Sequence, residues 1–356
     1  MKKALIAMSG GVDSSVAAYL MCAAGYDCIG ATMRLHNTEE AVREKSCCSL
    51  SDVEDARSVA VALGMKYYVF NFTADFDRQV IDRFVCAYEH GCTPNPCIDC
   101  NRYLKFDRMY HRAQELGLDY VVTGHYARIE RGENGRYLLK KGVTAEKDQS
   151  YVLYAMTQDQ LAHTQFPLGN YSKDEVRRIA AEQGFLNARK KDSQDICFVP
   201  DGDYAGFIRR YTGKDYPHGA FVDESGKVLG EHNGIICYTI GQRRGLNIAA
   251  GKPIYVQKIE PESNRVVLSG NDGLFASTVI AGDFNWIAFD APDHPIEVKA
   301  RARYHHPEQP ATATVLADGR VQVTFHDRQR ALTCGQAIVL YDGDVVVGGG
   351  TIEQVQ

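Results

Sequence analysis

A glycine- and serine-rich turn near the N-terminus constrains the fold more than any other stretch of this sequence. The segment Met8–Ser15, MSGGVDSS, follows the apolar run Lys3–Ala7 and precedes an apolar helical pattern at Val16–Met21. Adjacent glycines let the backbone take positive φ and approach a ligand closely, and Asp and Ser favour a helix N-terminus. Backbone N–H groups at such a turn, with a helix dipole behind them, bind anions. The segment therefore predicts a phosphate site, and an ordinary strand-to-helix turn is the alternative.

The string differs from the common nucleotide motifs. No Gly-Lys-Ser or Gly-Lys-Thr follows at the spacing of ATPase and GTPase loops, and the string is not GxGxxG. It resembles the SGGxDS loop of the ATP pyrophosphatase family, whose members cut ATP between the α- and β-phosphates to adenylate a substrate. The resemblance implies an enzyme that activates an oxygen by adenylation.

Length and composition limit the class of protein. The 356 residues predict two or three domains, and 45% hydrophobic with 24% charged residues is typical of a soluble globular protein. No apolar run approaches a membrane span of about 20 residues, and Met1–Lys3 leads into a strand, so a cytoplasmic location is expected. Eleven cysteines favour reduced, catalytic or metal-binding thiols over a secreted disulfide scaffold. The net charge of −5 argues against a uniformly basic nucleic-acid coat but allows a local basic track.

The order of elements predicts an α/β fold with an N-terminal doubly wound parallel sheet, a small β-rich central domain and a C-terminal β-barrel. Up to about residue 125, strand patterns alternate with helical patterns, which is typical of a parallel sheet whose ligands lie at the carboxyl ends of the strands. Strands are expected at Asp27–Arg34, Tyr67–Phe72, Asp119–His125 and Ile235–Thr239, and helices at Ser51–Gly64, Asp75–His90, Asn101–Leu116 and Lys173–Gly184. A hairpin is expected within Tyr126–Gly142. The expected domains are 1–200, 201–274 and 275–356.

The cysteines predict thiol chemistry. Cys97 and Cys100 form a CxxC pair before a helix expected to begin near Asn101, where the helix dipole lowers a thiol pKa and favours a nucleophilic Cys100. The alternative is half of a structural zinc site, although no second CxxC or His pair completes one. Cys197 lies between a polar turn and an apolar pair, and Cys47 and Cys48 stand in a polar loop where their roles stay open.

An ordered set of motifs identifies a family. The sequence closely resembles the tRNA-specific 2-thiouridylases of MnmA type, at Ser9–Ser15, Thr93–Pro96 with Cys100-Asn101, Thr123–Tyr126, Lys147–Tyr151, Asp192-Ser193 with Ile196–Phe198, Thr239–Gly245 and Gly348–Gly350. The resemblance implies ATP-dependent replacement of the C2 oxygen by sulfur in the wobble uridine of tRNA. It also implies Mg²⁺ with the ATP, and a cysteine desulfurase or sulfur-relay protein as the sulfur donor.

The resemblance also implies residue roles. Cys197 would carry a persulfide that attacks C2 or releases sulfide that does, and Cys100 would then attack the persulfide sulfur, leaving a Cys100–Cys197 disulfide. ATP would be bound by Ala7, Met8, Ser9, Gly10, Gly11, Val12, Asp13 and Ser14, with Met33 and Gly124 beside the adenosine. The target base or the tRNA would be contacted by Asn95, Pro96, Cys97, His125, Lys147, Asp148, Gln149, Arg303, Tyr304 and Gln336. Arg243-Arg244 and Arg189–Lys191 look like phosphate contacts, with solvated surface charges as the alternative.

One departure from the family pattern raises a further hypothesis. Many members carry Asp where this chain has Cys97, and Asp99 stands two residues further on. Three thiolates at Cys97, Cys100 and Cys197 could bind an iron–sulfur cluster with one open iron. The rival is a Cys97–Cys100 redox pair that protects the nucleophile. The competing functions are a tRNA lysidine synthetase, an amidotransferase-type synthetase, and a non-catalytic nucleotide- or RNA-binding module, none of which needs Cys100 and Cys197.

Overall fold

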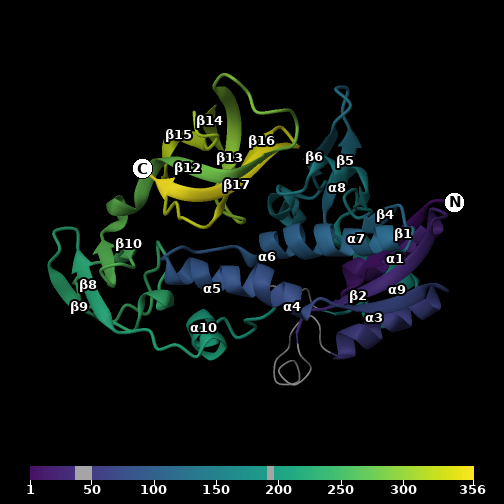
Figure 1. The fold of residues 1–356 in the computed structure, drawn as a ribbon, viewed down its shortest axis with the longest axis horizontal. Helices are drawn as coiled ribbons and strands as arrows, with labels where there is room; N and C mark the ends of the chain where they lie inside the picture. The colour runs from purple at the N-terminus through teal and green to yellow at the C-terminus, as the bar shows by residue number, and fades with distance from the viewer. Residues whose placement is uncertain (37–49, 191–195) are drawn as a thin grey trace.

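The computed structural model describes residues 1–36, 50–190 and 196–356, which form three sheets (Figure 1). Cys47, Cys48, Lys191 and the Asp192-Ser193 motif lie outside the described residues. Within the described part of the chain, no helix is long and apolar enough to cross a membrane.

The N-terminal sheet is parallel and has the strand order β3-β2-β1-β4-β7. Its strands are β1 (Lys3–Ala7), β2 (Asp27–Arg34), β3 (Lys66–Asn71), β4 (Tyr120–Val122) and β7 (Thr164–Gln165). The β2 bounds agree with the predicted ones. β1 lies between β2 and β4, so the turn that follows Ala7 starts at the carboxyl edge in the middle of the sheet.

Helices cover both faces of this sheet because β1 alternates its side chains between them. Ala4 and Ile6 pack with residues of α1 (Val12–Ala23), α3 (Leu50–Ala62) and α9 (Lys173–Glu182). Leu5 packs on the opposite face, in a core shared with α5 (Asp82–Glu89) and α7 (Met109–Glu115). The expected doubly wound sheet is confirmed.

The helical run that carries the CxxC pair begins earlier than expected. It consists of α6 (Pro96–Asp99), the π-helical η2 (Cys100–Arg108) and α7, so the predicted start near Asn101 is wrong. Asn95 caps the run by accepting a hydrogen bond from the Cys97 N–H at 3.2 Å, and Pro96 occupies the first helical position. Both residues favour a helix start at this point.

The middle part of the chain forms a four-stranded sheet of order β10-β11-β8-β9. Its strands are β8 (Gly219–Asp223), β9 (Val228–His232), β10 (Tyr255–Glu260) and β11 (Arg265–Ser269). One predicted strand is absent here, and one helix was not predicted. Ile235–Thr239 is not a strand, since Ile235–Cys237 forms a 3₁₀ turn (η5), and the helix α10 (Tyr204–Thr212) was not anticipated.

The C-terminal strands close into a barrel, as predicted. The order β12-β15-β14-β13-β16-β17 is closed by pairing of β12 with β17. These strands are β12 (Phe275–Trp286), β13 (Ile296–Arg301), β14 (Gln309–Val315), β15 (Val321–Arg330), β16 (Ala337–Asp342) and β17 (Val345–Val355).

The expected hairpin forms from β5 (Ala127–Arg131) and β6 (Tyr137–Lys141), and it joins the barrel rather than the N-terminal sheet. Val345 of β17 pairs with Lys140 of β6, and the Lys141 N–H donates to the Asp344 carbonyl at 2.8 Å. Figure 1 shows the hairpin standing between the N-terminal sheet and the barrel. A segment from the first half of the chain therefore extends the last sheet.

Candidate active site

The glycine-rich loop connects β1 to α1 at the predicted place. The Met8 N–H donates to the Ala31 carbonyl at 2.8 Å, and Thr32 donates to the Met8 carbonyl at 2.6 Å, so the loop begins tied to β2. The Ser14 hydroxyl accepts from the Ser9 N–H at 3.2 Å and donates to the Gly11 carbonyl at 3.0 Å. These bonds fix a compact turn at the start of α1, whose first residue is Val12.

Two glycines allow the close packing around this turn. Gly10 has φ +74°, and a Cβ there would lie 2.3 Å from the Asp52 carbonyl oxygen in the first turn of α3. A Cβ on Gly124, just after β4, would lie 2.9 Å from the Ser14 nitrogen. Only glycine fits either position, so the backbone of three elements converges at the loop.

The side chain of Asp13 is held by two partners at the mouth of the loop. Lys173 of α9 donates to both carboxylate oxygens at 2.8 Å, and the Tyr126 hydroxyl donates at 2.7 Å. The Lys173 ammonium thus balances the Asp13 charge.

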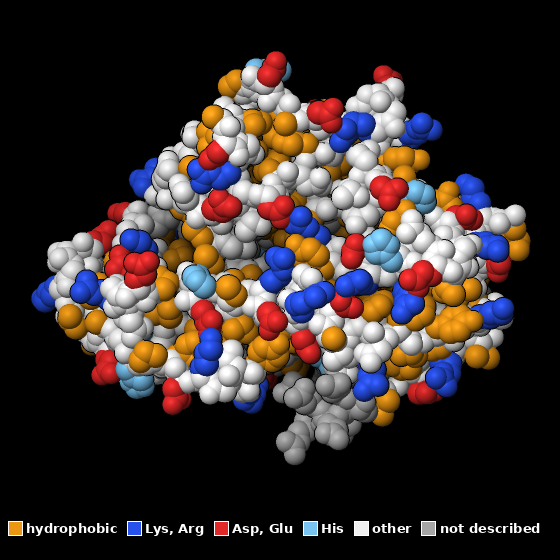
Figure 2. Space-filling model, in the orientation of Figure 1, with side chains coloured by type: hydrophobic (Ala, Val, Ile, Leu, Met, Phe, Trp, Pro, Cys, Tyr) orange, Lys and Arg blue, Asp and Glu red, His pale blue; other side chains and the backbone are white. Residues whose placement is uncertain are grey.

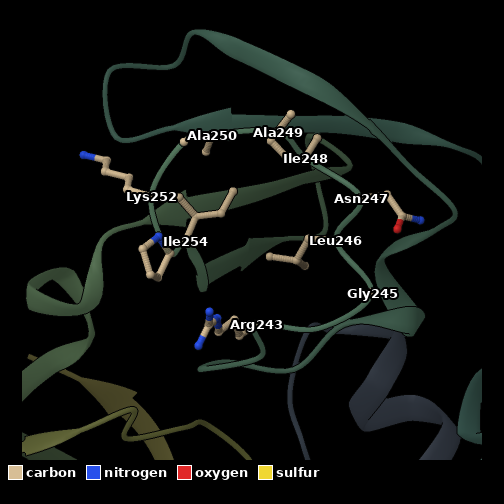
Figure 3. Close-up of a pocket in the computed structure, with 11 residues that line it drawn as sticks. Arg243, Gly245, Leu246, Asn247, Ile248, Ala249, Ala250, Lys252 and Ile254 are labelled. Atoms are coloured by element: carbon tan, nitrogen blue, oxygen red, sulfur yellow. The ribbon is translucent and has the colours of Figure 1, made fainter.

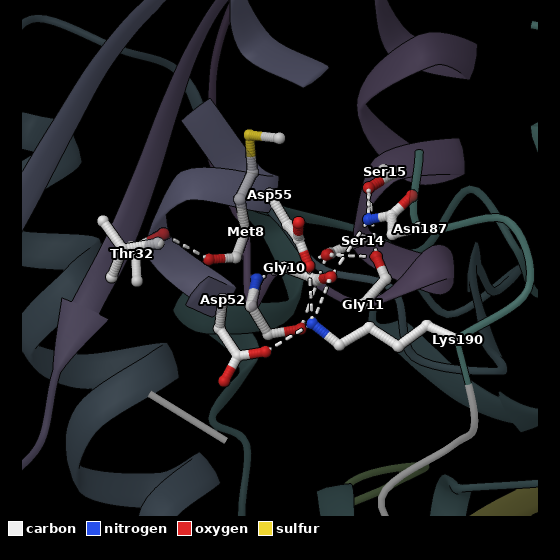
Figure 4. A network of polar contacts seen from close by, with 12 residues as sticks. Met8, Gly10, Gly11, Ser14, Ser15, Thr32, Asp52, Asp55, Asn187 and Lys190 are labelled. Atoms are coloured by element: carbon white, nitrogen blue, oxygen red, sulfur yellow. Dashed lines mark hydrogen bonds and ion pairs between the residues drawn. The ribbon is translucent and has the colours of Figure 1, made fainter. Parts of the chain in front are cut away.

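A second polar network holds the loop from the other side (Figure 4). The Asn187 amide donates to the Gly10 carbonyl at 3.0 Å and to the Ser15 hydroxyl at 2.9 Å. The Lys190 ammonium contacts the Gly10 carbonyl at 3.3 Å and the carboxylates of Asp52 and Asp55. Sequence reasoning missed Lys173 and Asn187. It named Lys190 only as one of three basic residues.

The geometry assigns the helix N-terminus to Cys97 rather than to Cys100. Cys97 is exposed in the first turn of α6, whereas the Cys100 N–H already bonds to the Pro96 carbonyl within the helix. We predicted that the helix dipole lowers the pKa of the Cys100 thiol. The helix begins at Pro96, and the dipole acts only within the first turn, so this prediction for Cys100 was wrong. Cys100 instead begins the π-helical segment, a geometry frequent at functional sites.

Cys100 and Cys197 border the same apolar core. Both are half-buried and pack against the cluster that contains Phe84 and Phe198. Residues 97 positions apart in the chain are thus brought to one side of the N-terminal sheet.

The iron–sulfur hypothesis does not fit the described side chains. Among residues 1–36, 50–190 and 196–356, no three His, Cys, Asp or Glu side chains are grouped closely enough to hold a metal ion. Cys97, Cys100 and Cys197 therefore do not form a ready ligand set.

The segment before the CxxC pair is fastened to the barrel. The Gln336 amide donates to the Thr93 carbonyl at 2.7 Å, and the Thr93 N–H donates to the Cys334 carbonyl at 2.9 Å. Two predicted contact residues, Asn95 and Gln336, thus lie on either side of one interface.

The predicted contacts around Lys147–Gln149 meet the barrel as well. The buried Asp148 carboxylate accepts from the Gly142 N–H at 3.1 Å and from the Ser150 hydroxyl at 2.9 Å. The Tyr304 hydroxyl donates to the Asp148 carbonyl at 3.2 Å. Burial, and then the charge of Asp148, raise the pKa of Tyr304.

Gln149 and His125 are held within the protein. The Gln149 side chain accepts from the Tyr126 N–H at 3.0 Å. His125 is buried between Phe106 and Phe166 and shares a 2.7 Å hydrogen bond with Thr123. Burial, aided by the charge of Lys105, lowers the pKa of His125 well below its usual range, so the ring is neutral.

Arg303 connects the barrel to the middle part of the chain. Its guanidinium donates to the Ile240 carbonyl at 3.4 Å, within the Thr239–Gly245 motif, and to the Ala331 carbonyl at 2.8 Å. Its buried Nε has no hydrogen-bond partner in the described part of the chain. Burial lowers the pKa of Arg303, and the nearby Arg330 lowers it further.

Basic side chains gather on two surfaces. An open cavity of about 660 Å³ is lined by residues 243 and 245–254, which include Arg243 and Lys252 (Figure 3). Figure 2 shows a row of Lys and Arg side chains across the middle of the molecule, over the helices α5 to α7.

Family models match three consecutive stretches of the chain. Residues 2–201 match the tRNA methyl transferase HUP domain, residues 205–270 the tRNA methyl transferase PRC-barrel domain, and residues 276–352 the aminomethyltransferase β-barrel domain. The fold and the glycine-rich loop therefore define a HUP-domain protein with a β-rich middle part and a C-terminal barrel.

Full-length relatives narrow this class. The chain is 52% identical to the tRNA-specific 2-thiouridylase MnmA of Clostridioides difficile (strain 630), over 99% of this chain and 98% of the relative. It is 53% identical to tRNA-specific 2-thiouridylase MnmA 1 of Thermoanaerobacter sp. (strain X514), with the same coverage. The chain belongs to the tRNA-specific 2-thiouridylase MnmA family.

Among solved structures, a 4-thiouridine synthetase–RNA complex with bound ATP matches 57% of this chain and 46% of its own chain. The TM-score is 0.40 and the identity 20%.

Proposed function

We propose that this protein catalyses the ATP-dependent 2-thiolation of the wobble uridine of tRNA. The observation that carries the proposal is 52% identity over 99% of the chain to a tRNA-specific 2-thiouridylase, together with a glycine-rich loop and two cysteines beside one core.

The first step is adenylation of the base. The uridine C2 oxygen attacks the α-phosphorus of ATP and pyrophosphate leaves, which converts a poor leaving group into a good one. In the loop from Ala7 to Ser14, the N–H groups at the start of α1 bind the phosphates, while Met33 and Gly124 flank the adenosine. Mg²⁺ would arrive with the nucleotide and neutralise the charge of the phosphates.

The second step transfers sulfur. A cysteine desulfurase or sulfur-relay protein loads Cys197 as a persulfide, whose terminal sulfur attacks C2 while AMP departs. The Cys100 thiolate then attacks the Cys197 sulfur, leaving the thiocarbonyl on the base and a Cys100–Cys197 disulfide. An external thiol supplies the two electrons that restore both thiols. The half-buried position of both cysteines against one core supports this pairing.

The target uridine must leave its stack to reach these groups. Ile98 of the CxxC helix packs in one apolar cluster with Ala337 and Tyr304, and we propose that the extruded base binds beside this cluster, next to Asn95, Pro96 and Cys97. Lys147 and Arg303 then contact the tRNA backbone, while Asp148, Gln149, His125 and Gln336 hold that surface in place.

The experiment is a thiolation assay with ATP, Mg²⁺, unmodified tRNA and a persulfide donor, with 2-thiouridine detected by mass spectrometry. Cys100→Ser and Cys197→Ser should abolish the product, whereas the control Cys86→Ser, an exposed thiol of α5, should leave it unchanged. Thiouridine made equally well by both variants contradicts the sulfur-transfer step. Its absence in the wild type contradicts the proposal as a whole.

A further inference from the structure

A lysine outside the phosphate loop reaches its backbone. The Lys190 Nζ lies 3.3 Å from the Gly10 carbonyl oxygen, 2.7 Å from Asp55 Oδ2 and 2.5 Å from Asp52 Oδ1. Figure 4 shows the ammonium between the loop and the two aspartates of α3. Its side chain retains 34% exposure, so it has room to turn.

The loop itself contains no cation. In MSGGVDSS the only charged residue is Asp13, whereas the phosphate loop of many ATPases carries its own lysine. The ammonium of Lys173 is committed to both oxygens of Asp13. Besides the Mg²⁺ that accompanies the nucleotide, any positive charge on a triphosphate at this loop therefore comes from elsewhere in the chain.

Lys190 is placed to supply that charge, but two carboxylates hold it. Two aspartates against one ammonium leave a negative charge beside the loop, which opposes the approach of a polyphosphate. The ammonium of lysine is a point charge on a flexible stem and can exchange one set of oxygens for another.

We propose that Lys190 is a phosphate-binding residue for ATP, held next to Gly10 by Asp52 and Asp55 and transferred from them to the phosphates when the nucleotide binds. The inference rests on the proposed function only in taking ATP as the ligand. In the rival arrangement, Lys190 permanently pins α3 to the loop.

The two arrangements predict opposite effects for the aspartates. If Lys190 is released to ATP, loss of the Asp55 charge makes the release easier and tightens ATP binding, but only while Lys190 is present. If Lys190 is a permanent pin, Asp55→Asn loosens the loop and weakens binding. If Asp55 acts on ATP only by repulsion, the tightening persists without Lys190.

The test measures the Kd of ATP in the presence of Mg²⁺ by calorimetry on the full chain. Lys190→Met should raise the Kd at least about tenfold, Asp55→Asn should lower it severalfold, and the double variant should match Lys190→Met. Lys190→Arg should restore most of the affinity. Lys258→Met, which removes an exposed lysine paired with Glu260 in the middle sheet, should leave the Kd unchanged.

The outcomes distinguish a failure of the proposed function from a failure of the Lys190 inference. Wild-type protein that does not bind ATP overturns the proposed function together with this inference. Wild-type binding with an unchanged Kd in Lys190→Met, or tightening by Asp55→Asn that survives in the double variant, overturns this inference alone. If Lys190→Met lowers the melting temperature, the change of the ATP Kd in Asp55→Asn still distinguishes the two arrangements. A permanent pin predicts weaker ATP binding in Asp55→Asn, whereas a released Lys190 predicts tighter binding.

Discussion

Replacing Gly10 by alanine tests the packing of the phosphate loop. The residue has φ +74°, where an L side chain costs about 1–2 kcal/mol. Its new Cβ would also meet the Asp52 carbonyl oxygen at 2.3 Å, a backbone atom that cannot swing away. Overpacking of this kind adds about 1–3 kcal/mol.

A matched control separates the two costs. Gly25 lies in the turn after α1 with φ +82°, and a Cβ there meets nothing within 4 Å. The cost of Gly25→Ala in folding free energy therefore comes only from the backbone strain at positive φ. At about 3 °C per kcal/mol for a domain of this size, Gly25→Ala should lower the melting temperature by about 5 °C and Gly10→Ala by about 10 °C.

Scanning calorimetry gives these melting temperatures, and ATP titration gives a second readout. Gly10→Ala should weaken ATP binding at least about tenfold because the N–H groups of the loop move, whereas Gly25→Ala should not. Equal melting temperatures for the two variants, with equal ATP affinity, would refute the claim that contact with α3 shapes the loop.

Two further predictions concern the CxxC helix and its attachment. Burial raises the pKa of Asp99 to about 6 from its usual 3.8, so its stabilising contribution is complete at low pH and is lost as the pH rises through 6. Asp99→Asn should therefore gain melting temperature relative to the wild type between pH 4 and pH 7, and a difference that is constant with pH contradicts this. Gln336→Ala removes the 2.7 Å bond to Thr93, costs about 1 kcal/mol, and should slow tRNA thiolation without changing the Kd of ATP. Gln322→Ala, at a barrel residue bonded within β15, is the control, and an equal loss of activity there contradicts a specific role for the attachment.

The strands and helices of the N-terminal sheet could be predicted because the burial of one or both faces determines the pattern of their apolar residues. The continuous apolar run of β1 and the glycine-rich turn after it suffice to predict a parallel sheet buried on both faces, with the turn at its carboxyl edge. The helix start at Pro96 was also readable, since Asn followed by Pro favours an N-cap and first helical position. The helix start was instead predicted after the CxxC pair, near Asn101.

Other features depend on contacts that local sequence does not encode. Asn187 meets Gly10 across 177 residues, and the Gln336 contact with Thr93 spans 243. The apolar run Ile235–Thr239 has strand propensity, yet the chain turns there, where Gly234 has φ +96°. Tertiary packing decides such positions, so the residues that hold the loop emerge only from the structure.

The attachment of the β5–β6 hairpin to the barrel affects how the protein is made. Lys140 is synthesised about 200 residues before its pairing partner Val345. Until then the outer edge of β6 presents unpaired backbone groups, a template for pairing with another chain. Two lysines of β6, Lys140 and Lys141, carry charge on that strand and would discourage such pairing during translation. Strand β17 thus completes a sheet that begins in the first half of the chain, and a chain cut before Val345 would keep an open edge at β6.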